Sequence, residues 1–282
     1  MRTPHLPPLP PIWNESRFGL EAASLLRSPV FRGEGVADAG GQPVLLIPGF
    51  MAGDNSFGLM TRWLRRTGHH TSRAGMRMNV NCSEAAVDCL EKRLDGMAER
   101  HGRRVAIVGQ SRGGQFARAL AVRRPELVSG IVTLGTPTYS AASIHPLVRV
   151  QVFAVGVLGS LGTPGLFRHS CLGGDCCRSF AEELVSEFPA GVGYLSVYSR
   201  KDGIVDWRSC LDPDAEHLEV AASHCGMSVN SRAYRAVADA LESYREQDAK
   251  RRPAARASAP SSRRKAASKR RRPTPRGEAA AA

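Results

Sequence analysis

Continuous apolar runs alternate along the chain with segments in which apolar residues recur every three or four positions. Three of the runs have the length of strands that are buried on both faces: 44–47, 105–108 and 128–134. The periodic segments between them have the spacing of amphipathic helices, the second with Ser83 as its N-cap: 56–67, 83–101 and 114–122. This alternation predicts an α/β fold with a mostly parallel central sheet flanked by helices.

The alternation stops between 138 and about 192 and then resumes. The interrupting segment contains an apolar stretch at 148–161, a turn rich in glycine and proline, and a helical pattern at 179–187. Beyond it the sequence predicts two further strands and a last helix: 194–199, 218–222 and 231–247. We interpret 138–192 as a cap inserted over the carboxyl edge of the sheet.

Composition divides the chain into a nearly neutral body and a basic end. The chain has 282 residues, of which 42% are hydrophobic, enough for one sizeable core. Of its net charge of +13, residues 249–282 carry +11, from twelve Lys or Arg residues and one acid, which leaves +2 for the rest. We therefore predict an N-terminal arm with a short helix at 1–40, a globular domain at 41–247 and a disordered basic tail at 248–282.

Three roles are open for the basic tail. A solvated extension is favoured, and contact with an anionic membrane surface through 249–276 comes second. The third is binding of an anionic polymer or nucleic acid through its charges. No aromatic residue lies among these charges, so we expect no specific nucleic-acid recognition.

Nothing in the N-terminal sequence resembles a secretory signal, because residues 1–11 are rich in proline and lack an apolar core. The most apolar run, 150–161, is shorter than the roughly 20 residues of a membrane-spanning helix. We therefore expect a cytoplasmic protein and leave peripheral membrane association open.

The strongest candidate for chemistry is the serine in Gly109-Gln-Ser111-Arg-Gly113, which follows one buried strand and precedes a helix. A serine on such a sharp turn presents its hydroxyl clear of the backbone, and the flanking glycines remove side chains that would clash. An ordinary glycine-rich turn could have the same pentapeptide. Whether Ser111 is a nucleophile therefore depends on the residues found elsewhere in the chain.

Two downstream loops supply the partners that a nucleophilic serine needs. Asp202 follows the strand at 194–199, and His224 follows the strand at 218–222. The carboxyl ends of parallel strands share one edge of a sheet, so these side chains can meet Ser111 there. Asp206 is an alternative acid, whereas His217 begins its strand and belongs to the opposite edge.

From about 43 to 244, the chain resembles the α/β-hydrolase superfamily, and within it the bacterial lipases and esterases. The resemblance rests on five segments in the family's order: 47–50, 109–114, 134–137, 202–205 and 223–227. Thr138 departs from the pattern, since a histidine is usual there. The resemblance implies an α/β-hydrolase fold with Ser111 as nucleophile, His224 as general base and then acid, and Asp202 as the residue that orients it. It also implies an oxyanion hole made of two backbone N–H groups, those of Phe50 and Arg112.

The function that follows is a serine hydrolase that cleaves carboxylic esters, esterase- or lipase-like, through an acyl-enzyme on Ser111. The expected partner is a small-molecule or lipid ester, with no cofactor and no metal. The alternatives are an acyltransferase or thioesterase with the same triad, and a non-catalytic binding protein tethered by its basic tail. The oligomeric state is left open.

The Arg112 side chain and the cysteines each have more than one interpretation. A salt bridge from Arg112 to an acidic surface residue is favoured over contact with a substrate carboxylate. Cys210 and Cys225 either form a disulfide or remain two reduced thiols. The cap cysteines Cys171, Cys176 and Cys177 are interpreted as a local disulfide or as free thiols, ahead of a zinc site with His169 as fourth ligand.

Overall fold

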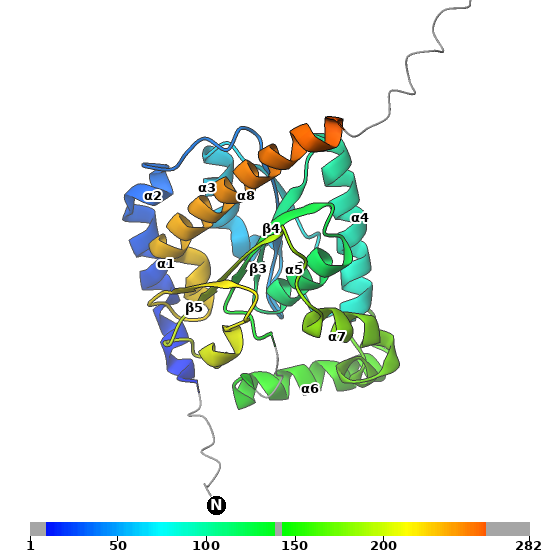
Figure 1. Cartoon of the computed structure of the whole chain (residues 1–282). Helices are drawn as coiled ribbons and strands as arrows, with labels where there is room; N and C mark the ends of the chain where they lie inside the picture. Colours follow the sequence, from blue (N-terminus) through cyan, green and yellow to red (C-terminus); the bar gives the residue numbers. More distant parts are fainter. Residues whose placement is uncertain (1–9, 139–142, 258–282) are drawn as a thin grey trace, which may run out of the picture. The chain divides into compact units, whose positions relative to one another are not determined.

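The central sheet consists of parallel strands in the computed structural model, which describes residues 10–138 and 143–257 (Figure 1). Within these residues, the strands are β1 (Pro43–Ile47), β2 (His70–Arg73), β3 (Val105–Gln110), β4 (Val128–Leu134), β5 (Gly193–Tyr198) and β6 (Glu216–Glu219). They lie in the order β2-β1-β3-β4-β5-β6, and every neighbouring pair is parallel. The mostly parallel sheet predicted from the apolar runs is therefore confirmed.

Helices cover both faces of this sheet (Figure 1). One face packs against α1 (Phe18–Arg27), α2 (Pro29–Arg32), α3 (Gly58–Arg66) and the beginning of α8 (Ser231–Ala257). The other packs against α4 (Ser83–His101) and α5 (Arg112–Arg123). Successive side chains of β1 alternate between the two cores, because side chains of a strand point to opposite faces: Val44 and Leu46 enter the first, Leu45 and Ile47 the second.

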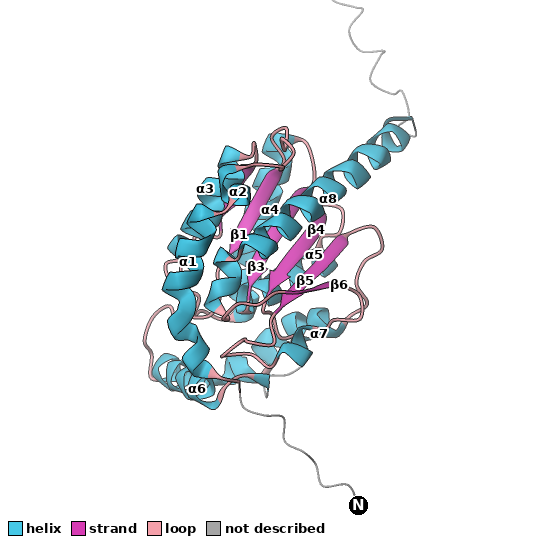
Figure 2. Cartoon of the chain, turned by 90° about the vertical axis from the view of Figure 1, so that its left-hand side faces the viewer, coloured by secondary structure: helices cyan, strands magenta, loops and turns pink. Residues whose placement is uncertain are grey.

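The segment between β4 and β5 is helical and lies beyond one end of the strands (Figure 2). Its helices are α6 (Pro146–Ser160) and α7 (Arg178–Val185), with short 3₁₀ turns between them at His169–Leu172 and Asp175–Cys177. A buried arginine ties this segment to the sheet layer. Arg118 of α5 donates to the carbonyl oxygens of Glu183 and Ser186 and forms an ion pair of 2.9 Å with Asp212.

Most predicted elements are present, but several of their boundaries differ from the sequence prediction. The last strand is β6 at Glu216–Glu219, earlier than 218–222, because an edge strand with exposed Glu216 and His217 lacks the apolar signal of a buried one. The N-cap of α4 is Cys82, whereas Ser83 was expected. The last helix continues to Ala257, so residues 248–257 are helical where a disordered tail was predicted.

The chain divides into two compact units, Met1–Asp248 and Ala249–Ala282. The sheet, the segment between β4 and β5 and all the residues discussed below belong to the first unit. The remainder of the predicted basic tail, 258–282, lies outside the described residues. In the part of the chain that the structure describes, no helix combines the length and the apolar character needed to cross a bilayer.

Candidate active site

Ser111 occupies a strained turn between β3 and α5. Its backbone has φ 51° and ψ −122°, a conformation that costs a non-glycine residue free energy and must be held by its surroundings. The Ser111 N–H donates to the Leu134 carbonyl at 2.8 Å, and its own carbonyl accepts from the Gly114 N–H at 2.9 Å. These two bonds fix the turn on both sides of the serine.

The flanking glycines of the pentapeptide are required by close backbone approaches. A Cβ atom on Gly109 would lie 2.4 Å from the Gly113 carbonyl oxygen, and one on Gly113 would lie 2.2 Å from the Ile47 carbonyl oxygen. Both distances are too short for real atoms, so no other residue fits without a backbone shift. The G-x-S-x-G pattern therefore has a structural cause beyond a preference for turns.

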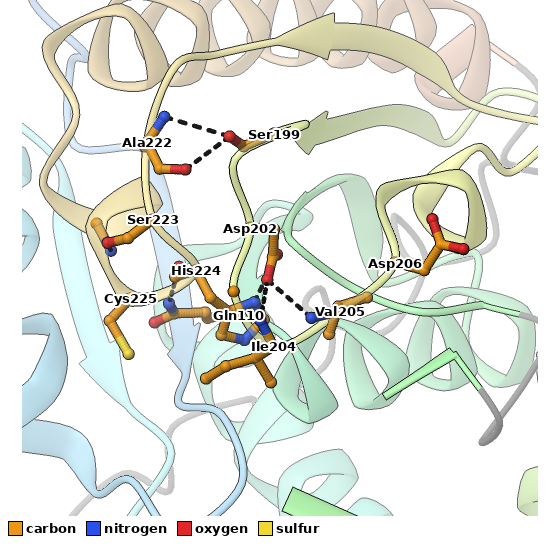
Figure 3. Close-up of polar contacts among 12 residues, drawn as sticks. Gln110, Ser199, Asp202, Ile204, Val205, Asp206, Ala222, Ser223, His224 and Cys225 are labelled. Atoms are coloured by element: carbon orange, nitrogen blue, oxygen red, sulfur yellow. Dashed lines mark hydrogen bonds and ion pairs between the residues drawn. The ribbon is translucent and has the colours of Figure 1, made fainter. Parts of the chain in front are cut away.

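Asp202 and His224 meet as a buried pair, as Figure 3 shows. The His224 Nδ1 atom lies 2.7 Å from Asp202 Oδ2. The other oxygen, Asp202 Oδ1, accepts two backbone N–H bonds of 2.8 Å, from Ile204 and Val205. This arrangement fixes the carboxylate in place and leaves Nε2 as the outward nitrogen of the imidazole.

The rival acid and the rival histidine do not take part in this pair. The Asp206 carboxylate caps a 3₁₀ turn by accepting from the Arg208 N–H at 3.1 Å, and it points away from His224 (Figure 3). His217 is exposed within β6. Of the candidate acids Asp202 and Asp206, the structure brings only Asp202 to His224.

Opposing influences determine the protonation of His224. Burial lowers the pKa of the imidazole, but the charge of Asp202, its hydrogen bond and the charge of Glu15 raise it. The net result is a pKa above the ordinary 6.5. The ring is thus set up to hold a proton, as a catalytic base must do midway through a reaction.

Glu15, from the N-terminal 3₁₀ helix Ile12–Arg17, holds both loops of this pair. Its Oε1 accepts from the N–H groups of Gly203 at 3.1 Å and His224 at 2.8 Å, and its Oε2 accepts from Cys225 at 3.0 Å. Sequence reasoning missed this residue. No local pattern marks it, because its partners lie about 190 to 210 positions away in the chain.

A second N-terminal carboxylate, Glu21 of α1, braces the histidine loop from the other side. It accepts from the Ser223 N–H at 2.8 Å and from the Ser223 hydroxyl at 2.6 Å. The N-terminal segment therefore contributes to the site and does more than cover the core.

Ser111 and His224 line the same cavity, whose volume is about 970 Å³. Its walls come from the loop after β1, from α6 through Val148 and Val152, and from Phe167. Such a volume is at the upper end of the range for small-molecule sites. No hydrogen bond joins Ser111 and His224 in this structure.

Two backbone N–H groups are available beside the serine. Phe50 and Arg112 both line the cavity, and neither backbone N–H donates to an acceptor within the described residues. A Cβ atom on Gly49 would come within 3.3 Å of Ser111 Cβ, which shows how closely the loop after β1 approaches the turn. Such an arrangement offers two donors to a negative oxygen that forms beside the serine.

The Arg112 side chain contradicts the expectation of a surface salt bridge. Its guanidinium is partly buried and donates to four neutral acceptors: the Asn79 carbonyl, Asn79 Oδ1, the Asn81 carbonyl and Ser83 Oγ. It also lies 5.0 Å from the centre of the Phe116 ring. Burial lowers its pKa to about 10. The side chain therefore fixes the loop before α4 and does not reach an acidic surface residue.

The cysteines are all free thiols, and each of the seven lies within the described residues. Cys210 is buried and Cys225 is exposed, without a disulfide between them. The cap cysteines form no local disulfide either. The thiol of Cys82 lies beside their three thiols. His169, the expected fourth ligand, instead packs its ring against Phe153.

No protein-family model and no curated protein matches the chain. Solved structures do match. The mature form of the Bacillus licheniformis lipase BlEst2 aligns at a TM-score of 0.52 with 16% identity, covering 72% of this chain and 92% of the lipase. A monoacylglycerol lipase from Paleococcus ferrophilus aligns at 0.50 with 16% identity, covering 74% of this chain and 96% of the lipase. The Listeria innocua lin2722 product aligns at a TM-score of 0.50 with 14% identity, covering 72% of this chain and 94% of that protein.

At this identity the likeness concerns the fold. This chain combines a parallel sheet with a strained serine turn after β3 and two later loops that carry an acid and a histidine. These features, together with the matched structures, show that the chain has the α/β-hydrolase fold.

Proposed function

We propose that the protein is a serine hydrolase that cleaves carboxylic esters through an acyl-enzyme on Ser111. The observation that carries the proposal is the buried His224–Asp202 pair, with a 2.7 Å contact, facing the cavity that the strained Ser111 turn also lines. The lipases of the same fold support an ester as the substrate class.

The proposed reaction uses each group in turn. His224 Nε2 accepts the Ser111 proton while the hydroxyl oxygen attacks the ester carbonyl, and the resulting oxyanion accepts from the N–H groups of Phe50 and Arg112. His224 then gives the proton to the leaving alcohol as the C–O bond breaks. Water repeats the sequence on the acyl-enzyme and releases the acid. Asp202 keeps Nδ1 protonated throughout and stabilises the imidazolium.

The test is Ser111→Ala, assayed with a short p-nitrophenyl ester and with a fluorophosphonate label. The variant should lose kcat by a factor on the order of 10⁴ or more and should lose all labelling. Ser24→Ala, an exposed serine of α1, is the matched control and should retain both. A wild-type protein that neither turns over esters nor reacts with the label would disprove the proposal.

An acyltransferase or thioesterase would use the same acyl-enzyme. In an acyltransferase an alcohol or thiol attacks it in place of water, and in a thioesterase the first leaving group is a thiol. Product analysis with competing alcohols and thiols separates them from a hydrolase. We expect the free acid as the main product, because the cavity opens to solvent and water can therefore reach an acyl group on Ser111. A dominant transfer product would contradict hydrolysis as the function.

A further inference from the structure

Four cysteines that are distant in sequence converge beside the cavity. Their Sγ atoms all lie within 4.8 Å of one another, and they form a cluster that we call the four-cysteine cluster: Cys82, Cys171, Cys176 and Cys177. Cys82 is the N-cap of α4, and the other three lie on the two 3₁₀ turns between α6 and α7. The cluster therefore joins the cap to the sheet layer.

The separations between the sulfurs suit ligands of a single metal ion. Neighbouring Sγ atoms are 3.4 Å apart for Cys82 and Cys177, 3.5 Å for Cys171 and Cys176, and 3.8 Å for Cys176 and Cys177. A tetrahedral zinc ion with Zn–S bonds of about 2.3 Å requires sulfurs roughly 3.8 Å apart. A disulfide would require about 2.05 Å, and all four residues are free thiols.

The start of α4 brings N–H donors to the cluster. The backbone N–H groups of Glu84 and Ala85 lie beside the Cys82 sulfur, and that of Glu84 also lies beside Cys177. N–H donors of this kind stabilise negative sulfur and orient it toward a metal.

Arg112 adds a positive charge at the same place. Its partly buried guanidinium lies near enough to three of the four sulfurs to attract a negative charge on them, while its hydrogen-bond partners are all neutral. A zinc ion bound by four thiolates carries a net charge of −2. The Arg112 cation and the N–H groups of α4 offset that charge, and Arg112 forms no ion pair with a carboxylate of the described residues.

We propose that the four-cysteine cluster binds one Zn²⁺ ion, with all four sulfurs as ligands. Each cysteine releases its thiol proton to solvent as the metal binds. Four thiolates fill the tetrahedral coordination of zinc and leave no position for water or substrate, so the site is structural. Because Cys171 and Cys177 also line the active-site cavity, the metal fixes one wall of that cavity to the start of α4.

The test begins with the full chain purified under reducing conditions, with its metal content measured by mass spectrometry. We expect one zinc per chain. Cys82→Ser and Cys176→Ser, one from each side of the cluster, should lose that stoichiometry, whereas Cys89→Ser, an exposed cysteine of α4, should keep it. Cobalt substitution should give thiolate-to-metal charge transfer and the intense visible bands of a tetrahedral site.

Several results would overturn the proposal, and none of them depends on enzymatic activity. One is a reduced wild-type chain that binds no zinc even after Zn²⁺ is added. Others are iron in place of zinc, or a native thiol titre that is four short because two disulfides have formed. The metal content of the wild-type chain tests the proposal even if one of the variants fails to fold. Equal loss of zinc in Cys89→Ser would also reject the assigned ligands.

Discussion

At the scale of single residues, the protonation of His224 determines when the proposed base can act. The base must be neutral to accept the Ser111 proton, and the charges of Asp202 and Glu15 outweigh burial and place its pKa above 6.5. As pH falls, the imidazole therefore becomes protonated earlier than an ordinary histidine. We predict that kcat/KM declines through an acid limb centred above pH 6.5, as a pH–rate profile with a neutral ester would show.

Asp202→Asn sharpens this prediction. An asparagine can hold the ring, but it removes the charge that favours the imidazolium and the acceptor that fixes the Nδ1 proton. We expect kcat to fall by a factor on the order of 10⁴ and the acid limb to move to lower pH. Asp206→Asn should leave both unchanged, since Asp206 contacts Arg208 and not His224. A fall in kcat of less than about tenfold would show that Asp202 does not orient the base.

Single residues also show what sequence can and cannot predict. Ser111, Asp202 and His224 were predicted because each follows a strand, and parallel strands deliver their carboxyl ends to one edge. The hydrogen bonds of Arg112 were not predictable, since its acceptors on Asn79, Asn81 and Ser83 come from a loop whose path depends on the whole fold. A charged side chain in a sequence gives no sign of the cavity that will enclose it.

At the scale of elements, the N-terminal helices hold the two loops that follow β5 and β6 and carry Asp202 and His224. The Glu15 carboxylate accepts three N–H groups across those loops, and its charge helps raise the pKa of His224. Hydrophobic periodicity predicts a helix here but says nothing about the polar residues at its end. The contact joins the beginning of the chain to its last loops, so it becomes visible only in three dimensions.

Glu15→Gln tests this role. The amide removes the negative charge, and its NH₂ group cannot accept from the backbone N–H groups that Oε1 or Oε2 now bind. We expect the acid limb of kcat/KM to move to lower pH, because one of the charges that raise the His224 pKa is lost, and kcat to fall by about three- to tenfold.

The pH profile separates positioning from general damage to the fold. Glu34→Gln, on an exposed glutamate paired with Arg32, is the matched control and should change neither kcat nor the profile. A Glu15→Gln enzyme with reduced kcat but an unshifted acid limb would mean that the carboxylate only packs the loop.

At the scale of the whole molecule, the cap has two distinct surfaces. One face of α6 supplies Val148 and Val152 to the cavity. The opposite side leaves large apolar side chains exposed: Leu147, Val150, Phe153, Val157, Leu158 and Leu161. The sequence predicted a cap from the break in alternation, but the break alone could not say which residues face inward. Nor could it reveal that Cys82 joins the cap cysteines, because 89 positions separate Cys82 from Cys171.

An apolar surface of this kind beside a large cavity suits an ester held in a lipid assembly, if the proposed hydrolase acts on one. Val150 is 64% exposed, so a charge there meets water and should not disturb the fold. At a lipid surface the same charge would lose its water. We predict that Val150→Glu leaves kcat/KM for a soluble short-chain ester within about twofold of wild type but lowers the rate on an emulsified long-chain ester by about tenfold.

This prediction is tested by comparing the rates on the soluble and the emulsified ester. Leu20→Glu places the same charge on α1, where the leucine is 76% exposed, and should leave both rates unchanged. If Val150→Glu lowered both rates equally, the substitution would have damaged the cavity wall that the other face of α6 forms. If it lowered neither, the exposed apolar face of α6 would take no part in the reaction with either ester.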